Sequence, residues 1–337
     1  MKCVVLLIVF LFAPVVRGQD RPKRIGAIEF YGYAGLDLDK VRAAIPVHEG
    51  DSFATSDETF FETLNRIKKE IKQMTGNPPT DVAAVCCDPQ GNYWIYIGLL
   101  GNSVRTTPHN PVPKGKLRLP TRIVELYEQT NQLSSELVGK GIASEDRSKG
   151  YALSNDASLR AKQLAKRAYA LSHELFLRRV LRSSADPEQR TVAANFLGYA
   201  RQSRAQIGDL VWASHDVDAG VRNDAIRALG VLAESSPKVA RQIPPEGFID
   251  MVSSGSWTDR NKAGFLLDEL SARRDPKLLG QLRSRSLDSL IEMARWRGRG
   301  HADFARILLG RIAGIEETRL QQLVDAGQVD QIIGALK

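Results

Sequence analysis

Apolar and polar positions alternate from Arg24 to Tyr33 and predict a β-strand, which Gly32 and Gly35 bring to an end. Apolar residues then recur at helical spacing over 36–45 and 60–71. The apolar runs 82–87 and 93–99 flank a polar turn and predict a β-hairpin. The order β-α-α-β-β therefore predicts a small α+β domain over 24–101.

The remainder of the chain has helical periodicity. Residues 102–120 are rich in proline and have little periodicity, so we expect a linker there. A helix and a polar connector follow over 121–156, and further helices extend over 157–337. The apolar positions of the first of these, within 157–182, are Ala161, Leu164, Ala168, Leu171 and Leu175. The whole chain is therefore predicted to be mostly α.

One pattern within the helical part repeats at intervals. Asp186, Arg190, Ala193, Leu197 and Gly198 recur 32 positions later. The recurring set is Asp218, Arg222, Ala225, Leu229 and Gly230. Weaker copies follow at Arg260, Ala263 and Leu267, and at Ala305, Leu309 and Gly310. Repeats of this length predict stacked helix pairs in which Asp caps a helix, Arg pairs with an acid of an adjacent loop, and Leu fills a shared core.

This D-x-x-x-R-x-x-A-x-x-x-L-G pattern resembles that of HEAT repeats, and in particular of the short HEAT-like repeats of phycobilisome lyases. The resemblance covers about 157–337 and implies an α-solenoid that binds other proteins. Those lyases act on bilin cofactors in the cytoplasm.

The N-terminal domain resembles a POTRA domain. The resemblance is carried by residues of the first strand, the first helix and the turn after it: Ile25, Ile28, Phe30, Gly32, Val41, Ile45, Gly50 and Phe53. It implies that partners bind by adding a strand to a sheet edge. An unrelated α+β sandwich is the alternative. POTRA domains usually occur in tandem before a barrel or membrane segment, and neither follows here.

The first residues predict an exported protein. Val4 to Phe12 is an apolar run too short to span a bilayer, and Val16 and Gly18 are small residues suited to cleavage before Gln19. Residues 1–18 are thus predicted to be a signal peptide, and the mature protein to be periplasmic or secreted. A buried N-terminal helix and an uncleaved anchor are the alternatives.

The charge is modestly basic. The formal net charge is +8, and loss of Lys2 and Arg17 with the signal peptide lowers it to +6. This excess is small for a nucleic-acid-binding protein, so we expect no nucleic-acid partner. Peripheral association with the cell envelope stays open, and the sequence does not specify an oligomeric state.

The cysteines do not predict a disulfide framework. Cys3 would leave with the signal peptide, and Cys86 and Cys87 are adjacent, so in a strand their side chains would point to opposite faces. We expect them to be small apolar strand residues, one directed inward and one outward.

No motif predicts catalysis, a cofactor or a metal site. His173-Glu174 lacks the second histidine of a zinc-protease helix because Leu177 occupies that position. No phosphate-binding loop or G-x-S-x-G motif occurs. A catalytic triad assembled from distant residues stays open, but we expect a protein that is not an enzyme.

The candidate partner-binding residues are Trp212, Arg295, Trp296, Arg297 and Arg299. The 295–301 segment concentrates arginines beside a tryptophan, a combination that docks anionic or peptide partners through guanidinium contacts and stacking. The alternative is a solvated loop with Trp296 packed beneath it, and for Trp212 a core position.

Together these features predict an exported scaffold or adaptor that binds a protein partner through a HEAT-like solenoid. One alternative is an envelope or secretion component that binds partners by strand addition. The other is a lyase-like or chaperone-like enzyme accessory.

Overall fold

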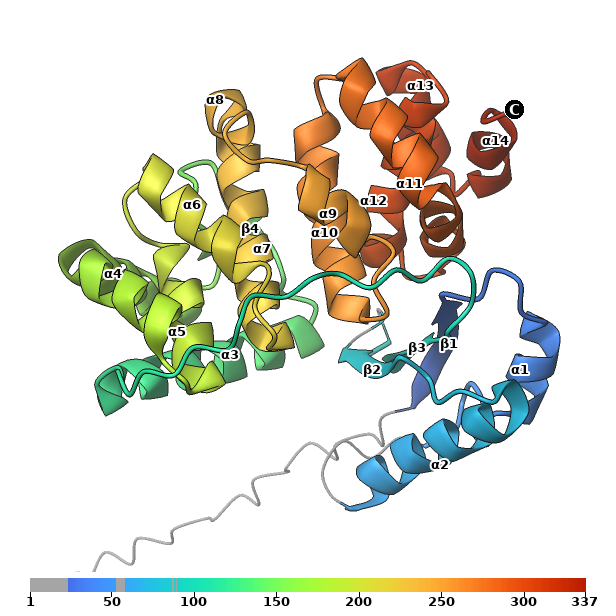
Figure 1. Ribbon diagram of the computed structural model, residues 1–337, viewed down its shortest axis with the longest axis horizontal. Helices are drawn as coiled ribbons and strands as arrows, with labels where there is room; N and C mark the ends of the chain where they lie inside the picture. The colour runs from blue at the N-terminus through green and yellow to red at the C-terminus, as the bar shows by residue number, and fades with distance from the viewer. Residues whose placement is uncertain (1–23, 53–57, 87, 89) are drawn as a thin grey trace, which may run out of the picture.

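The computed structural model describes residues 24–52, 58–86, 88 and 90–337. The described chain is mostly helical, with a small three-stranded sheet near its N-terminal end (Figure 1). The predicted signal peptide, Phe53 and Cys87 lie outside the described residues. No helix in the described ranges has the length and apolar character needed to cross a bilayer.

The N-terminal module, residues 24–101, has the element order that the sequence predicts. Its elements are β1 (Ile25–Tyr31), α1 (Leu38–Ala44), α2 (Glu58–Thr75), β2 (Asp81–Cys86) and β3 (Tyr93–Gly98). The sheet order is β1-β3-β2, with β1 parallel and β2 antiparallel to the central β3.

Both faces of this sheet are covered. Ile28, Phe30 and Ile95 belong to one face and pack with Ile67 and Ile71 of α2. Alternate strand residues point the other way, and there Tyr31, Trp94 and Tyr96 join the core of the helices that follow. The sheet is therefore a middle layer between α1/α2 and the rest of the protein (Figure 1).

The remaining helices form what we call the helical array. Its N-terminal half comprises α3 (Thr121–Gly139), α4 (Ala157–Ser183), α5 (Pro187–Leu197), α6 (Arg204–Ala213) and α7 (Ala219–Ser235). Its C-terminal half comprises α8 (Pro237–Ala240), α9 (Glu246–Met251), α10 (Trp257–Ser271), α11 (Pro276–Ala294), α12 (Arg299–Ile312), α13 (Glu317–Asp325) and α14 (Val329–Gly334). A small hairpin, β4 (Glu145–Asp146) and β5 (Leu153–Ser154), lies between α3 and α4.

Successive helices of the array pack side by side. Helices α5, α7, α10 and α12 form one row, in which each contacts the next, and α6, α9 and α11 lie against that row (Figure 1). Asp186 and Asp218 cap α5 and α7 at corresponding places, and Leu197 and Leu229 are both buried. The repeated sequence positions therefore occupy equivalent positions in space.

The repeated arginines connect these layers. Each buried guanidinium reaches an acid in the next layer: Arg190 to Asp216 at 2.7 and 2.8 Å, Arg222 to Asp259 at 2.8 and 3.1 Å, and Arg260 to Glu292 at 3.2 Å. The predicted pairing of Arg with an acid of an adjacent loop is confirmed for Arg190, because Asp216 lies in the loop before α7; Asp259 and Glu292 instead lie within α10 and α11. Because both partners of each pair are buried, the loss of either one would leave the other as an unpaired buried charge.

The proline-rich segment 102–120, which we call the strap, lies along the array (Figure 1). Its backbone N–H groups donate to carbonyl groups in two inter-helix loops and at the last residue of α4. The pairs are Arg105 to Ser253 at 2.8 Å, Asn110 to His215 at 2.7 Å and Gly115 to Ser183 at 2.7 Å. The predicted linker therefore does join two parts of the chain, but backbone hydrogen bonds fix its course.

The cysteine expectation is wrong at Cys86, which is disulfide-bonded. The expectation assumed the strict side-chain alternation of a regular strand, whereas Cys86 is the last residue of β2, where that alternation no longer constrains it.

Candidate functional site

Two of the predicted partner-binding residues instead hold the N-terminal module. Trp296 is only 1% exposed, and its indole N–H donates to the carbonyl of Phe30 at 3.0 Å. Its ring lies edge-on to Tyr96, with the ring centroids 5.0 Å apart. Arg297 pairs with Glu29 at 2.8 Å and with Glu49 at 2.5 Å. Neither residue is arranged to receive a separate partner.

The other arginines of this segment face the C-terminal helices. Arg295 approaches Asp330 at 3.5 Å, and Arg299 approaches Asp303 at 3.6 Å and Asp325 at 3.4 Å. The 295–299 arginines therefore do not form one surface, because Arg297 points toward the module and the other two point toward α12, α13 and α14.

Trp212 is half-buried at the end of α6. The guanidinium of Arg182 lies over its ring, 4.6 Å from the ring centroid, and its carbonyl accepts a hydrogen bond of 2.7 Å from the Asn110 side chain of the strap. The structure thus places Trp212 as a packing residue beneath the strap, far along the chain from the 295–299 segment.

The module, the strap and the array meet at Glu292 of α11. Its carboxylate, almost fully buried, accepts five hydrogen bonds. The donors are the N–H groups of Gly32 at 2.7 Å, Tyr33 at 3.0 Å and Ala34 at 3.0 Å, Ser103 Oγ at 2.6 Å and Arg260 Nη1 at 3.2 Å. Gly32 has φ +72°, which lets the chain turn after β1 and present three successive N–H groups. Glu292 has a structural role here, because its hydrogen-bonding capacity is used within the chain.

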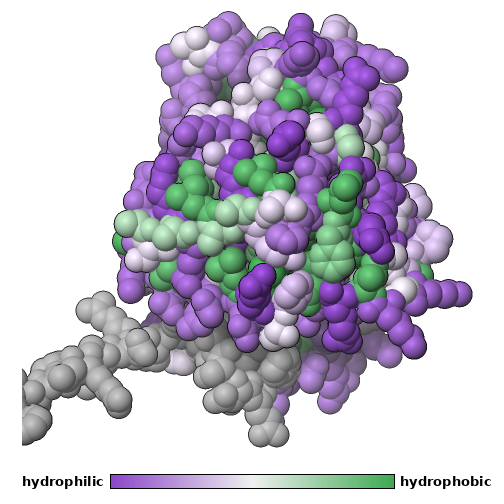
Figure 2. Space-filling model, turned by 90° about the vertical axis from the view of Figure 1, so that its left-hand side faces the viewer, coloured by the Kyte–Doolittle hydropathy of each residue, from purple (hydrophilic) through white to green (hydrophobic). Residues whose placement is uncertain are grey.

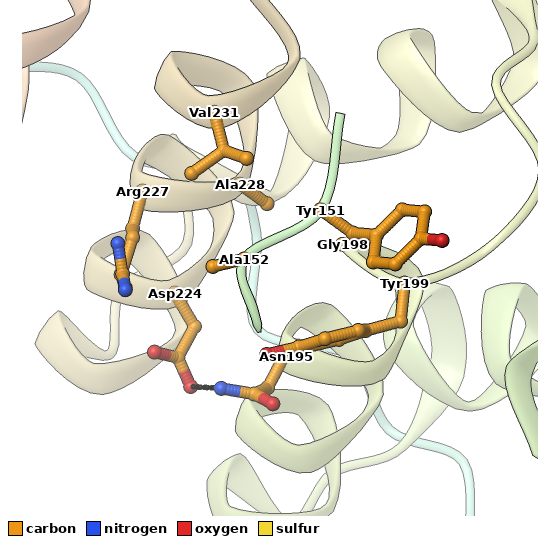
Figure 3. Close-up of a pocket in the computed structure, with 9 residues that line it drawn as sticks. All are labelled: Tyr151, Ala152, Asn195, Gly198, Tyr199, Asp224, Arg227, Ala228 and Val231. Atoms are coloured by element: carbon orange, nitrogen blue, oxygen red, sulfur yellow. Dashed lines mark hydrogen bonds between the residues drawn. The ribbon is translucent and has the colours of Figure 1, made fainter. Parts of the chain in front are cut away.

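A small polar hollow lies between α5 and α7, beneath the segment that carries Tyr151 and Ala152 (Figure 3). Asp224 accepts hydrogen bonds there from Asn195 at 3.2 Å and from Tyr127 Oη at 3.1 Å. The Asn195 side-chain oxygen is buried and has no hydrogen-bond partner among the described residues.

Charged groups near this hollow have shifted pKa values. Lys166 is 2% exposed, and its burial lowers the pKa of the ammonium to about 8. Burial also raises the pKa of Asp224, an effect that the neighbouring Lys166 opposes. Such groups can perform acid–base chemistry where a substrate reaches them.

The hollow is too small for acid–base chemistry on a bound substrate. Its volume is ≈ 40 Å³, whereas a water needs roughly 10–15 Å³ and ligand pockets typically have about 300–1,000 Å³. A substrate does not fit. We therefore interpret the hollow as part of a buried polar network that ties α3, α4, α5 and α7 together. The described residues also contain no group of three or more His, Cys, Asp or Glu side chains placed to hold a metal ion.

A surface suited to binding lies on α4 instead. Leu164, Leu171 and Leu175 are 46%, 42% and 74% exposed, and Ala161 and Ala168 are exposed beside them. These five residues, together with exposed Ala165, are called the α4 stripe below. Figure 2 looks onto this end of the molecule and shows hydrophobic side chains gathered between hydrophilic borders. The sequence predicts this side of the helix as apolar, and the structure leaves it uncovered.

Basic residues lie toward the C-terminal end of α4, beyond a bend of this helix at His173, which separates Leu171 from Leu175. The strap passes there, because Gly115 bridges to Ser184. Lys114, Lys116, Arg122 and Arg179 are exposed, and none lies within ion-pair distance of a carboxylate in the described part of the chain. Residues 102–186 hold 15 Lys and Arg against 8 Asp and Glu, so this quarter of the chain carries +7 of the formal net charge of +8. This excess of basic residues over 102–186 is the sequence feature that could have indicated the surface.

Comparison with known proteins assigns no family. No protein-family model matches the chain, and no curated protein matches its sequence. A crystal structure of an engineered protein aligns with 64% of this chain and 93% of its own, at 16% sequence identity and a TM-score of 0.37. A similarity this low does not support an inference about fold or function.

Proposed function

We propose that this protein is an exported, non-enzymatic scaffold that binds a protein partner at the α4 stripe. The observation that carries the proposal is the stripe itself, an uncovered row of leucine and alanine side chains on a helix at the end of the array. Exposed apolar patches of this kind commonly mark interaction surfaces. The terminal units of a helical-repeat protein are ordinarily polar on their outer side.

The repeated helix pairs support a HEAT-like solenoid as the architecture of this scaffold. Asp caps and buried leucines recur in α5 and α7, and buried Arg–acid pairs recur at Arg190, Arg222 and Arg260. Export is proposed from the apolar run at the start of the sequence.

Site-specific cross-linking tests the proposal. A photoreactive phenylalanine analogue replaces Leu171 in the full chain, and a matched variant carries it at Leu100, an equally exposed leucine of the N-terminal module. We expect irradiation of cells that make the protein to give a discrete cross-linked species from position 171 and none from position 100. Identical products from both positions, or none from position 171, would refute the proposal.

The same experiment separates a second candidate function, strand addition to the sheet. The outer edge of β1 is closed by Glu49, Trp296 and Arg297, so β2 is the remaining edge strand. Cross-linking from Val82 on β2, with none from Leu171, would favour strand addition over binding at the stripe.

A further inference from the structure

We infer that the partner element at the α4 stripe is an amphipathic α-helix with acidic residues along its borders. This inference rests on the proposed function and adds the chemistry of the partner. Three features of the described structure lead to it: the shape of the stripe, its likeness to the contacts inside the array, and the charge around it.

The shape of the stripe suits a helix. Between Ala161 and Leu171 the exposed residues of α4 are all alanine or leucine. Small residues let a second helix approach closely, and helix axes pack about 8–10 Å apart according to the side chains at the contact. Leu164 and Leu171 are seven residues apart and therefore lie on the same side of the row formed by Ala161, Ala165 and Ala168, so another helix can pack over the alanines with its own apolar side chains against this leucine ridge.

The array already uses this chemistry between its layers. Helix α5 packs against α7, and both carry buried alanines and leucines: Ala193, Ala194 and Leu197 on α5, and Ala225 and Leu229 on α7. The outer side of α4 presents the same residue types at the end of the array, where the described residues add no further layer. A helix from a partner would therefore continue a packing mode that this chain already adopts.

The charge around the stripe selects an acidic partner. Lys114, Lys116, Arg122 and Arg179 have no acidic partner within the described ranges, so a helix with Glu or Asp along its borders would pair with them. A second copy of this chain would bring the same basic residues and be repelled. Membrane-surface helices usually also expose Trp or Phe, and none of the exposed large hydrophobic residues in the described structure is aromatic.

Peptide binding to the full chain tests the inference. The probes are two fluorescent 18-residue synthetic helices with identical leucine and alanine faces, one bordered by glutamate and the other by lysine. We expect the glutamate peptide to bind at least about tenfold more tightly than the lysine peptide, and the difference to shrink as salt rises.

Variants locate the binding site. Leu171→Glu should weaken binding of the glutamate peptide by about tenfold or more, because it removes apolar contact and adds a repelling charge. The double variant Arg122→Glu/Arg179→Glu should abolish the preference for the glutamate peptide. Leu100→Glu is the matched control and should leave binding unchanged. All these positions are exposed, so circular dichroism should show unaltered folding.

Three results would overturn the inference. Equal binding of the two peptides would show that the stripe does not select an acidic helix. Binding to vesicles of anionic phospholipid that Leu171→Glu abolishes, without peptide binding, would assign the stripe to a membrane. A dimer in solution that Leu171→Glu dissociates would assign it to a second copy. In the first case a cross-linked protein at position 171 would still support the scaffold, so the two proposals can fail separately.

Discussion

Replacement of Glu292 by glutamine tests whether one buried carboxylate joins the module, the strap and the array. The substitution keeps the shape of the side chain but replaces one oxygen by an N–H₂ donor. In the less disruptive orientation this donor faces the N–H of Gly32 and the guanidinium of Arg260, which now donate to Oε2 at 2.7 and 3.2 Å. The other oxygen keeps Tyr33, Ala34 and Ser103 as donors.

The expected cost follows from these two lost contacts. A buried donor left without an acceptor costs about 1–3 kcal/mol, and breaking one partner out of a buried ion pair costs about 3–5 kcal/mol. Arg260 is fully buried and already has one nitrogen without a partner among the described residues, so it has no alternative acceptor at hand. We therefore expect Glu292→Gln to lower the free energy of unfolding by about 3–5 kcal/mol.

Urea unfolding followed by tryptophan fluorescence measures this loss, because Trp257 and Trp296 lie where the module meets the array. Glu246→Gln, at an exposed acid, is the control and should change stability by less than about 0.5 kcal/mol. Hydrogen exchange should speed up at the amides of Gly32, Tyr33 and Ala34 before it does so inside the array. A loss below about 1 kcal/mol, with unchanged exchange at these amides, would refute the reasoning.

Two further predictions concern buried charge. Burial lowers the pKa of His301, which lies between Tyr96 and Trp257, from 6.5 to about 4. The stability that this neutral histidine contributes is complete above pH 6.5 and is lost as pH falls through 4. The free energy of unfolding should therefore drop by about 2 kcal/mol more between pH 7.5 and 5 in the native protein than in His301→Gln; equal losses in both proteins would contradict it. Arg222→Ala should lower the free energy of unfolding, measured in urea, by about 3–5 kcal/mol because it leaves Asp259 buried and charged. The double variant Arg222→Met/Asp259→Leu should recover part of that loss. A double variant less stable than Arg222→Ala would count against the ion pair as the origin of the loss.

Local and periodic features of the fold could be predicted from the sequence. The Asp caps of α5 and α7 and the buried leucines of the repeats depend on residues a few positions apart, and helical spacing encodes them directly. Arg190 and Arg222 also donate to carbonyls at equivalent places, six and five residues before each arginine. Their acidic partners are not equivalent, because Asp216 precedes the cap of α7 whereas Asp259 lies inside α10.

The candidate site depended on contacts that such patterns do not encode. The strap is held through backbone N–H groups at Arg105, Asn110 and Gly115, which any residue except proline could supply. The structure matches the packed alternative for Trp296 and not its candidate role in partner binding, and its contact with Phe30 joins segments far apart in the chain. The aromatic residues on the second face of the strands, Tyr31 and Tyr96, were the available signal that this sheet is covered on both sides.

Periodicity also identifies the apolar side of α4 without specifying what covers it. Leu164 and Leu171 have the spacing of a core-facing stripe, yet they lie at the end of the array, where no helix of the described ranges covers them. Whether such a stripe is core or interface depends on the number and order of the neighbouring helices, a tertiary property.

The docking of the N-terminal module against α10–α12 imposes an order on biosynthesis. Gly32 meets Glu292 across 260 positions of the chain, so residues 24–101 are synthesised well before the helices against which they dock. Until α11 and α12 have emerged, the aromatic side of the sheet has nothing to pack against and is exposed to aggregation. A linear stack of repeats can lose end units one at a time. A chain truncated before α11, in contrast, would lose the contacts that hold residues 24–101 in place.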